Sequence, residues 1–170
     1  FLRMILRGLL SALCVMTLSG CYTLGDARPA MMRGISTMAV PVSKNLTLEP
    51  NVEALLADTI TKQLQTDGTY SINYSDRSDA VLSTTLTEVR RAPARSLRGN
   101  VIATSEYVLF TTVQYDLVES STGRSLMSGN VTGQTSFFVT ADLQTDEQQA
   151  LPLAFADTAN KLASRLSEGF

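Results

Sequence analysis

SEYVLFTTVQYDLV, residues 105–118, is the stretch of sequence that decides the fold. Its apolar and polar side chains alternate, which is the pattern of a half-buried β-strand. One face carries Tyr107, Leu109, Val113, Tyr115 and Leu117. The next residues, Ser120 to Gly123 (SSTG), predict a hairpin turn, because glycine adopts the positive φ that tight turns need. A second long strand over residues 124–139 then returns against the first, so the sequence predicts a long antiparallel hairpin.

Two glycines interrupt this second strand. Gly129 and Gly133 lie inside it and predict either a bulge or a place where another backbone comes close. The residues before the hairpin add three shorter strand candidates, over 35–42, 70–74 and 80–89, of which the first ends at a proline and polar residues.

Two amphipathic helices complete the prediction. Residues 50–68 place Val52, Leu55, Leu56, Ile60 and Leu64 on one stripe, with Thr61 facing away and Gly68 at the C-cap. A second helix starts at Thr145, where Thr145 and Gln148 resemble a capping box, and Pro152 is expected to bend it. The predicted fold class is α+β, a mixed four- to five-stranded sheet with two amphipathic helices packed on one face.

The N-terminal residues have the pattern of an export signal. Arg3 and Arg7 precede an uncharged stretch that is shorter than the roughly 20 apolar residues needed to span a bilayer. Leu18-Ser19-Gly20-Cys21 at its end resembles the bacterial lipobox. We expect residues 1–20 to be a lipoprotein signal peptide, 21–34 a tether acylated at Cys21 with chains such as palmitate, and 35–170 a single α/β domain. An ordinary secretory signal, or a helix that happens to contain Cys21, is the alternative.

Composition restricts the function of the mature chain. Without Arg3 and Arg7, 12 basic residues face 16 acidic ones, a net charge of −4, which does not suit a nucleic-acid partner. The chain has no histidine, and its two cysteines are Cys14 in the leader and Cys21. The commonest general base and the commonest neutral metal ligand are therefore missing. We expect no catalytic residues, no metal and no cofactor, and no enzymatic activity.

The order of motifs along the chain resembles the lipopolysaccharide-assembly lipoproteins of the LptE family. The resemblance starts at Cys21-Tyr22-Thr23-Leu24 and continues through residues 34–42 (GISTMAVPV). Further matches are Val89-Arg90-Arg91-Ala92-Pro93, Ser105-Glu106-Tyr107, Thr122-Gly123-Arg124 and Gln149-Ala150-Leu151-Pro152.

The resemblance implies a place and a role. Proteins of this family sit in the outer membrane beside or inside a β-barrel translocon (LptD-like), help to insert lipopolysaccharide into the outer leaflet, and contact lipopolysaccharide directly. Their fold is a sheet covered by two helices. In lipoproteins of Gram-negative bacteria an Asp after the acylated Cys commonly signals inner-membrane retention, so Tyr22 favours a lipid-anchored, periplasm-facing position in the outer membrane.

A basic cluster is the candidate binding site. Four arginines lie within nine positions: Arg90, Arg91, Arg95 and Arg98. Guanidinium groups bind phosphate oxygens bidentately, so the cluster suits a phosphorylated glycolipid. The alternatives are a solvated hairpin loop, or a contact with acidic residues of the barrel. Asp142 and the pair Asp146-Glu147 could form a metal or acid–base site, but the macrodipole of the last helix explains Asp146 and Glu147 at its start more simply.

Two other functions compete with lipopolysaccharide assembly. A periplasmic lipoprotein that docks onto or regulates a cell-wall synthase or a secretion pore would have the same anchor and a similar order of elements. A hydrolase with an unusual site is the third hypothesis, and the absence of histidine counts against it.

Overall fold

A computed structural model describes residues 29–73, 77–94, 106–140 and 142–169 of the chain. The predicted signal peptide, the acylation site Cys21, and Arg95 and Arg98 of the basic cluster lie outside the described residues. The elements are, in chain order, η1 (Ala30–Met32), β1 (Thr37–Ala39), β2 (Lys44–Asn45), α2 (Glu53–Asp67), β3 (Ser71–Ile72), β4 (Ala80–Pro93), β5 (Glu106–Glu119), β6 (Ser125–Phe138) and α3 (Leu143–Glu168).

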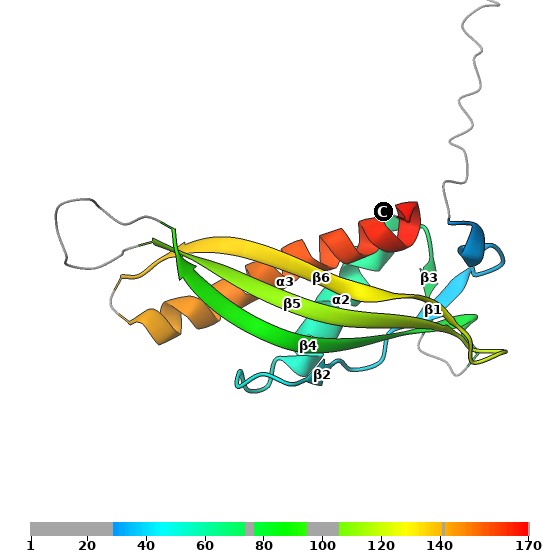
Figure 1. The fold of residues 1–170 in the computed structure, drawn as a ribbon, viewed down its shortest axis with the longest axis horizontal. Coiled ribbons are helices and arrows are strands. Elements are labelled where there is room, and N and C mark those ends of the chain that lie inside the picture. The colour runs from blue at the N-terminus through cyan, green and yellow to red at the C-terminus, as the bar shows by residue number, and fades with distance from the viewer. Residues whose placement is uncertain (1–28, 74–76, 95–105, 141, 170) are drawn as a thin grey trace, which may run out of the picture.

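The predicted fold class is confirmed. Six strands form one mixed sheet in the order β3-β1-β4-β5-β6, and β2 also pairs with β4. The pairs that involve β1, β2 and β3 are parallel, whereas β4, β5 and β6 pair antiparallel. Both helices lie on the same face of the sheet, and α3 runs along β6 and β5 (Figure 1).

The long antiparallel hairpin that the sequence predicts is present as β5 and β6. β5 and β6 are 14 residues each, with Tyr107 opposite Phe137 and Leu117 opposite Met127. Gly123 in the connecting turn has a φ of 70°, a left-handed conformation that favours glycine. The alternation also holds: the side chains of Leu109, Thr111, Val113, Tyr115 and Leu117 are buried beneath the helices.

The first predicted strand is much shorter than residues 35–42. Ala39 pairs with Val81 and Lys44 with Thr85, so five steps along the edge correspond to four along β4. One extra residue therefore bulges between β1 and β2, where Pro41 cannot donate a ladder hydrogen bond. Ser43 returns to the sheet, and its hydroxyl lies 2.7 Å from that of Thr84.

β4 is longer than predicted, because it continues through the arginines to Pro93. Its pairing with β5 shifts between Leu86 and Glu88, so a bulge lies there. After the bulge Arg90 lies opposite Phe110 and Arg91 opposite Leu109. Arg90 and Arg91 therefore belong to strand β4 rather than to a hairpin loop, because pairing with β5 holds both residues extended.

The helix predicted over 50–68 is confirmed, with a shifted buried face. Gly68 has a φ of 74°, and its N–H donates to the Leu64 carbonyl, so it is the predicted C-cap. Leu55 is 38% exposed and Thr61 is 5% exposed, the reverse of the prediction. The buried stripe of α2 turns toward Ala57 and Thr61, which face the segment from Ala39 to Val42 at the sheet edge.

The last helix begins three residues earlier than predicted. Its N-cap is Asp142, whose carboxylate accepts hydrogen bonds from the N–H groups of Gln144 and Thr145 and from the Thr145 hydroxyl. The predicted Thr145 N-cap is therefore wrong, since that side chain points back to the true cap. The helix passes through Pro152 without interruption, at a position where the proline ring is exposed.

Gly133 is where α3 touches the sheet, which confirms the predicted close approach of another backbone. A Cβ atom at this position would lie 2.2 Å from the Thr158 hydroxyl oxygen and 2.4 Å from the Thr158 backbone nitrogen. Only glycine therefore allows α3 to sit this low over β6.

Candidate functional site

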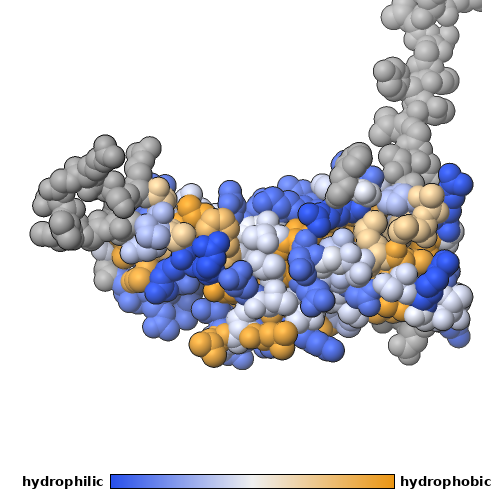
Figure 2. Space-filling view, viewed as in Figure 1, coloured by the Kyte–Doolittle hydropathy of each residue, from blue (hydrophilic) through white to orange (hydrophobic). Residues whose placement is uncertain are grey.

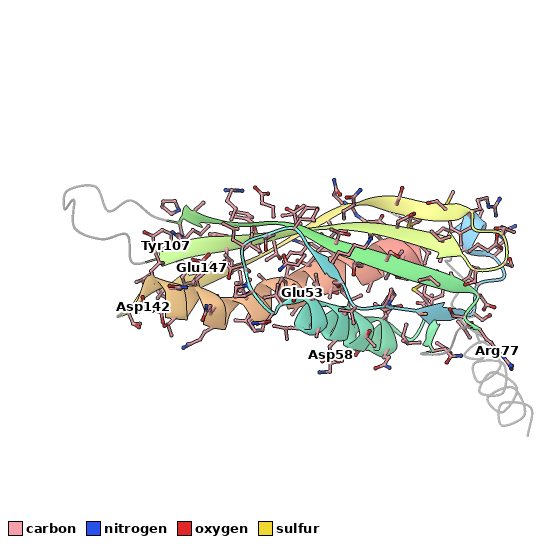
Figure 3. All side chains as sticks on the ribbon, turned by 90° about the horizontal axis from the view of Figure 1, so that it is seen from below. Glu53, Asp58, Arg77, Tyr107, Asp142 and Glu147 are labelled. Atoms are coloured by element: carbon pink, nitrogen blue, oxygen red, sulfur yellow. The ribbon has the colours of Figure 1, made fainter. Side chains whose placement is uncertain are left out.

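The face of the sheet away from the helices is a long surface that is available for binding. Figure 3 shows both helices on one side of the long strands and no described element on the other. We call this surface the open face. Its residues are Ser83, Thr85, Glu88, Arg90 and Ala92 of β4, Glu106, Val108, Phe110, Thr112, Gln114, Asp116 and Val118 of β5, and Ser128, Asn130, Thr132, Gln134, Ser136 and Phe138 of β6.

The open face is mainly polar, because hydroxyls and amides are its commonest side chains, and its charged residues are Glu88, Arg90, Glu106 and Asp116. The polar groups hydrogen-bond across the strands, as in the 3.1 Å contact between the Thr112 and Thr132 hydroxyls. Such a surface can accept and donate hydrogen bonds over the length of three 14-residue strands. It has few groups that could perform acid–base chemistry, so its arrangement suits binding.

Arg90 lies on the open face, next to the apolar ring of Phe110. Its guanidinium carbon lies 4.5 Å from the centre of the Phe110 ring, in a cation–π arrangement. A second contact, 3.8 Å long, joins Arg90 to Glu88, and both side chains are more than half exposed. Exposed ion pairs of this kind contribute little stabilising free energy, so the guanidinium is available to an anionic group of a ligand.

Arg91 faces the other way, toward the helices. Its guanidinium donates to the Glu147 carboxylate at the start of α3, and the Glu147 side chain is only 11% exposed. Glu147 is thus not merely a charge at a helix N-terminus, as the sequence suggested. The structure separates Arg90 and Arg91 onto opposite faces of β4, and it gives Arg91 a structural partner.

A small cleft adjoins this ion pair. Its volume is about 350 Å³, and Glu49, Asp142 and Glu147 line it together with Arg91. The acids outnumber the arginine, so the cleft repels rather than attracts a phosphate. Tyr107 lies at the same end of the sheet (Figure 3), stacked on Phe137 at 5.9 Å between ring centres.

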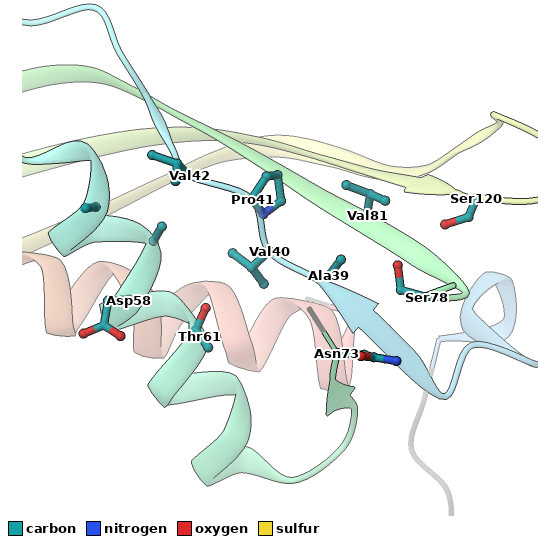
Figure 4. A pocket seen from close by; sticks show the side chains of 12 residues that line it. Ala39, Val40, Pro41, Val42, Asp58, Thr61, Asn73, Ser78, Val81 and Ser120 are labelled. Carbon is teal, nitrogen blue, oxygen red and sulfur yellow. The ribbon is translucent and has the colours of Figure 1, made fainter. Parts of the chain in front are cut away.

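An apolar groove of about 710 Å³ lies at the bulged edge of the sheet. The segment from Ala39 to Val42 forms one wall, and Ala54, Ala57 and Thr61 of α2 form the other. Figure 4 shows Val40 and Thr61 facing each other across it. The sequence signals this groove only through the proline that interrupts the edge strand.

The loop between β2 and α2 exposes apolar side chains that sequence analysis did not single out. Leu48 is fully exposed, at 101%, and Leu46 is 72% exposed. Figure 2 shows apolar residues protruding at the bottom of the view, over this loop. At the end of β6, Phe138 is 64% exposed, whereas Phe137 is buried.

Metal and membrane-spanning features are not found in the part of the chain that the structure describes. No group of three or more potential ligand residues gathers within residues 29–73, 77–94, 106–140 and 142–169. Within the same ranges, no helix has the length and apolarity to cross a bilayer.

Comparison with known proteins shows a shared fold. No family model and no curated protein matches the chain. Among solved structures, the PelC dodecamer of Paraburkholderia phytofirmans is 20% identical at a TM-score of 0.51, covering 82% of this chain and 92% of that chain. A minor lipoprotein of Acinetobacter baumannii is 14% identical at a TM-score of 0.50, with coverages of 79% and 94%.

A third structure, the hypothetical protein CT253 of Chlamydia trachomatis, is 9% identical at a TM-score of 0.54 and covers 78% of this chain and 96% of that chain. Identities this low show the arrangement of helices and strands alone. None of the three is named an LptE protein, so the resemblance to that family stays a prediction.

Proposed function

We propose that this chain is a lipid-anchored, periplasm-facing lipoprotein of the outer membrane that binds a β-barrel translocon (LptD-like) during lipopolysaccharide assembly. Acylation at Cys21 is supported by the lipobox-like Leu18-Ser19-Gly20-Cys21 behind a basic, apolar leader. Lipoproteins also occur among proteins of the same fold, as the Acinetobacter baumannii structure illustrates.

A binding role rather than catalysis is the second part of the proposal. It rests on the absence of histidine from the whole sequence and on the chemistry of the open face. Without histidine, acid–base catalysis near neutral pH would need a carboxyl or lysine with a strongly shifted pKa. The role is therefore that of an assembly and docking factor with no cofactor.

The open face is the observation that supports a large, flat partner. Three strands of 14 residues expose hydroxyls and amides on this side, and no described element covers them. A partner whose own surface is built of strands can match the open face in length and polarity. A small ligand would instead need a deep pocket. The β-barrel is the partner class that the resemblance implies.

Direct contact with lipopolysaccharide is assigned to Arg90. Its guanidinium lies over Phe110, so a cation and an apolar ring are adjacent on the open face. A phosphorylated glycolipid offers both an anion and acyl chains. Arg91 is removed from this role because it pairs with Glu147 on the helix side.

The central experiment is cross-linking in the native cell. A photoreactive residue at Gln114, in the middle of the open face, should cross-link to an LptD-like barrel identified by mass spectrometry. The same residue at Lys62 on α2, whose side chain is 71% exposed, is the matched control and should not. Equal yields at both positions, or an open-face product that is not a barrel, would reject the docking proposal.

Two further measurements separate its parts. Intact-mass analysis should find Cys21 acylated and residues 1–20 removed, and an unmodified thiol would reject the anchor. Arg90→Glu should bind immobilised lipopolysaccharide more weakly than the wild type, while Lys62→Glu, which makes the same charge change on α2, should not. Unchanged binding by Arg90→Glu would remove that contact.

A specific observation favours a second candidate, a lipoprotein that docks onto a cell-wall synthase or secretion pore. PelC has the same fold and its solved structure is a dodecamer, so this fold also occurs in assemblies of another kind. Depletion of the chain discriminates the two. Loss of surface lipopolysaccharide supports the first function, and altered peptidoglycan or secretion with normal lipopolysaccharide supports the second.

A further inference from the structure

Among the strands that the structure describes, β6 is at the edge of the sheet, with β5 on one side and no described strand on the other. In such a strand every second residue directs its N–H and C=O away from the sheet. The outward groups include the carbonyls of Asn130 and Thr132 and the N–H of Gln134. A row of such groups is a template on which another extended chain can pair.

Three side chains of α3 occupy this row. Asp157 accepts a hydrogen bond of 2.8 Å from the Gln134 N–H, Lys161 donates 3.1 Å to the Thr132 carbonyl, and Arg165 donates 2.8 Å to the Asn130 carbonyl. The acceptor side chain meets the N–H and the two cations meet the carbonyls. These three outward groups therefore each have a partner of the right kind.

The spacing explains how a helix can match a strand. Asp157, Lys161 and Arg165 are four residues apart on α3, a rise of about 6 Å per step. Their partners on β6 are two residues apart in the opposite direction, a rise of roughly 6.6–6.8 Å per step. Because these two step lengths are similar and α3 runs antiparallel to β6, the three side chains and their three partners stay in register.

Gly133 brings the helix within reach. It lies between Thr132 and Gln134, at the point where a Cβ atom would clash with the backbone of Thr158. The glycine lowers α3 onto β6, and the side chains next to Thr158 in sequence and one turn further on then reach around the strand to its edge. Gly133 and the hydrogen bonds from α3 to the edge of β6 are thus parts of the same contact between helix and strand.

The charges support one another within this arrangement. Lys161 lies 2.8 Å from the Asp157 carboxylate. Burial raises the pKa of Asp157, but the hydrogen bonds from Lys161 and from the Gln134 N–H outweigh that effect, and the pKa lies below its usual value. The carboxylate is therefore charged at neutral pH and acts as an acceptor.

We propose that Asp157, Lys161 and Arg165 form an edge guard that prevents β6 from pairing with β6 of a second copy of this chain. Antiparallel pairing about a twofold axis at Thr132 would place Asn130 of one copy opposite Gln134 of the other. Three of the groups that such a pair needs at these positions, the Gln134 N–H and the Asn130 and Thr132 carbonyls, are already held by the edge guard. This inference goes beyond the docking function, which uses the open face.

The test measures the mass of the full chain in detergent by light scattering. The variant D157A/K161A/R165A should have about twice the wild-type mass at high concentration, because pairing of two equal edges closes after two copies. The control is D58A/K62A, which removes an Asp–Lys pair with the same four-residue spacing from α2. It should keep the wild-type mass.

A second variant identifies the edge. Adding Gln134→Pro to the triple variant removes an N–H that points away from β5 and should restore the wild-type mass. A folded triple variant with unchanged mass would overturn the proposal, as would an increase that Gln134→Pro does not reverse or that D58A/K62A shares.

Amide hydrogen exchange keeps the test decisive if the triple variant does not fold. In the wild type the Gln134 amide should be protected, and the single change Asp157→Ala should accelerate its exchange by at least about tenfold. Fast exchange of Gln134 in the wild type would show that the edge is not guarded.

Discussion

Arg91 on β4 and Glu147 on α3 lie 56 residues apart in the chain, and their guanidinium and carboxylate form an ion pair. The pair fixes the first turns of α3 to the sheet at the end where β4 and β5 leave the core. Glu147 is 8% exposed as a residue, whereas the Arg91 side chain is 47% exposed. The buried carboxylate therefore needs the arginine as its charged partner, whereas the arginine, which is half exposed, needs the carboxylate less.

Arg91→Ala should lower the free energy of unfolding by about 1–3 kcal/mol, because it leaves a mostly buried carboxylate without its counter-ion. Arg90→Ala, on the open face, should change the free energy by less than about 1 kcal/mol. Urea denaturation checks both. The double variant R91L/E147L should recover most of the loss, and a loss equal to the sum of the single changes would show that the two side chains are not coupled.

Gly133→Ala should lower the free energy of unfolding by about 2 kcal/mol or more, because the added Cβ would overlap the backbone of α3 at Thr158. Gly129→Ala is the matched control on the same strand. Its Cβ would lie 3.3 Å from the Tyr115 hydroxyl oxygen, a contact that a small shift relieves. Thermal unfolding should separate the two variants clearly, and similar losses at both positions would contradict the close approach at Gly133.

The β5–β6 hairpin and the two helices can be predicted from the sequence, because the residues that indicate them lie close together in the chain. Alternation in β5, Gly123 in the turn and Gly68 at the end of α2 each act within a few residues. Gly133 is also local evidence, since glycine inside a strand indicates a close approach. What it approaches is not local, and the sequence does not identify Thr158.

Most of the errors concern contacts between residues far apart in the chain. The predicted strand ends at Val89, but pairing with β5 extends β4 through Arg90 and Arg91. The same pairing places the two arginines on opposite faces. The error at the start of α3 is local, because the pattern at Thr145 resembles a capping box although Asp142 is the N-cap.

Thr111 and Thr158 form a buried hydroxyl pair between β5 and α3, 2.7 Å apart, with both residues fully buried. Thr111→Val or Thr158→Val should each lower the free energy of unfolding by about 1–2 kcal/mol, because the remaining hydroxyl loses a partner. The double variant T111V/T158V should be less destabilised than the sum of the two, since no hydroxyl is then left. A double-mutant cycle from urea denaturation measures this coupling, and strict additivity would contradict it.

Asp79 gives the protein an acid-sensitive connection between β1 and the turn before β4. Its carboxylate accepts hydrogen bonds of 2.9 and 2.8 Å from the N–H groups of Ser36 and Thr37, and its own N–H donates to the Thr37 hydroxyl. The backbone hydrogen bond from Ser36 and then those from Thr37 hold the pKa of Asp79 below its usual value of 3.8.

Because the folded-state pKa of Asp79 is lowered, the unfolded chain binds the proton more readily than the folded one. The stabilisation is therefore fully present above the unfolded pKa and is lost as the pH falls through the folded one. Asp79→Asn should lower the urea midpoint at pH 7, and its difference from the wild type should shrink as the pH falls below 3.8. Asp142 is the comparison, because hydrogen bonds from Thr145 also lower its pKa, and it holds a different element, α3. A difference between Asp79→Asn and the wild type that stays constant from pH 7 to pH 2 would mean that the charge of Asp79 does not stabilise this connection.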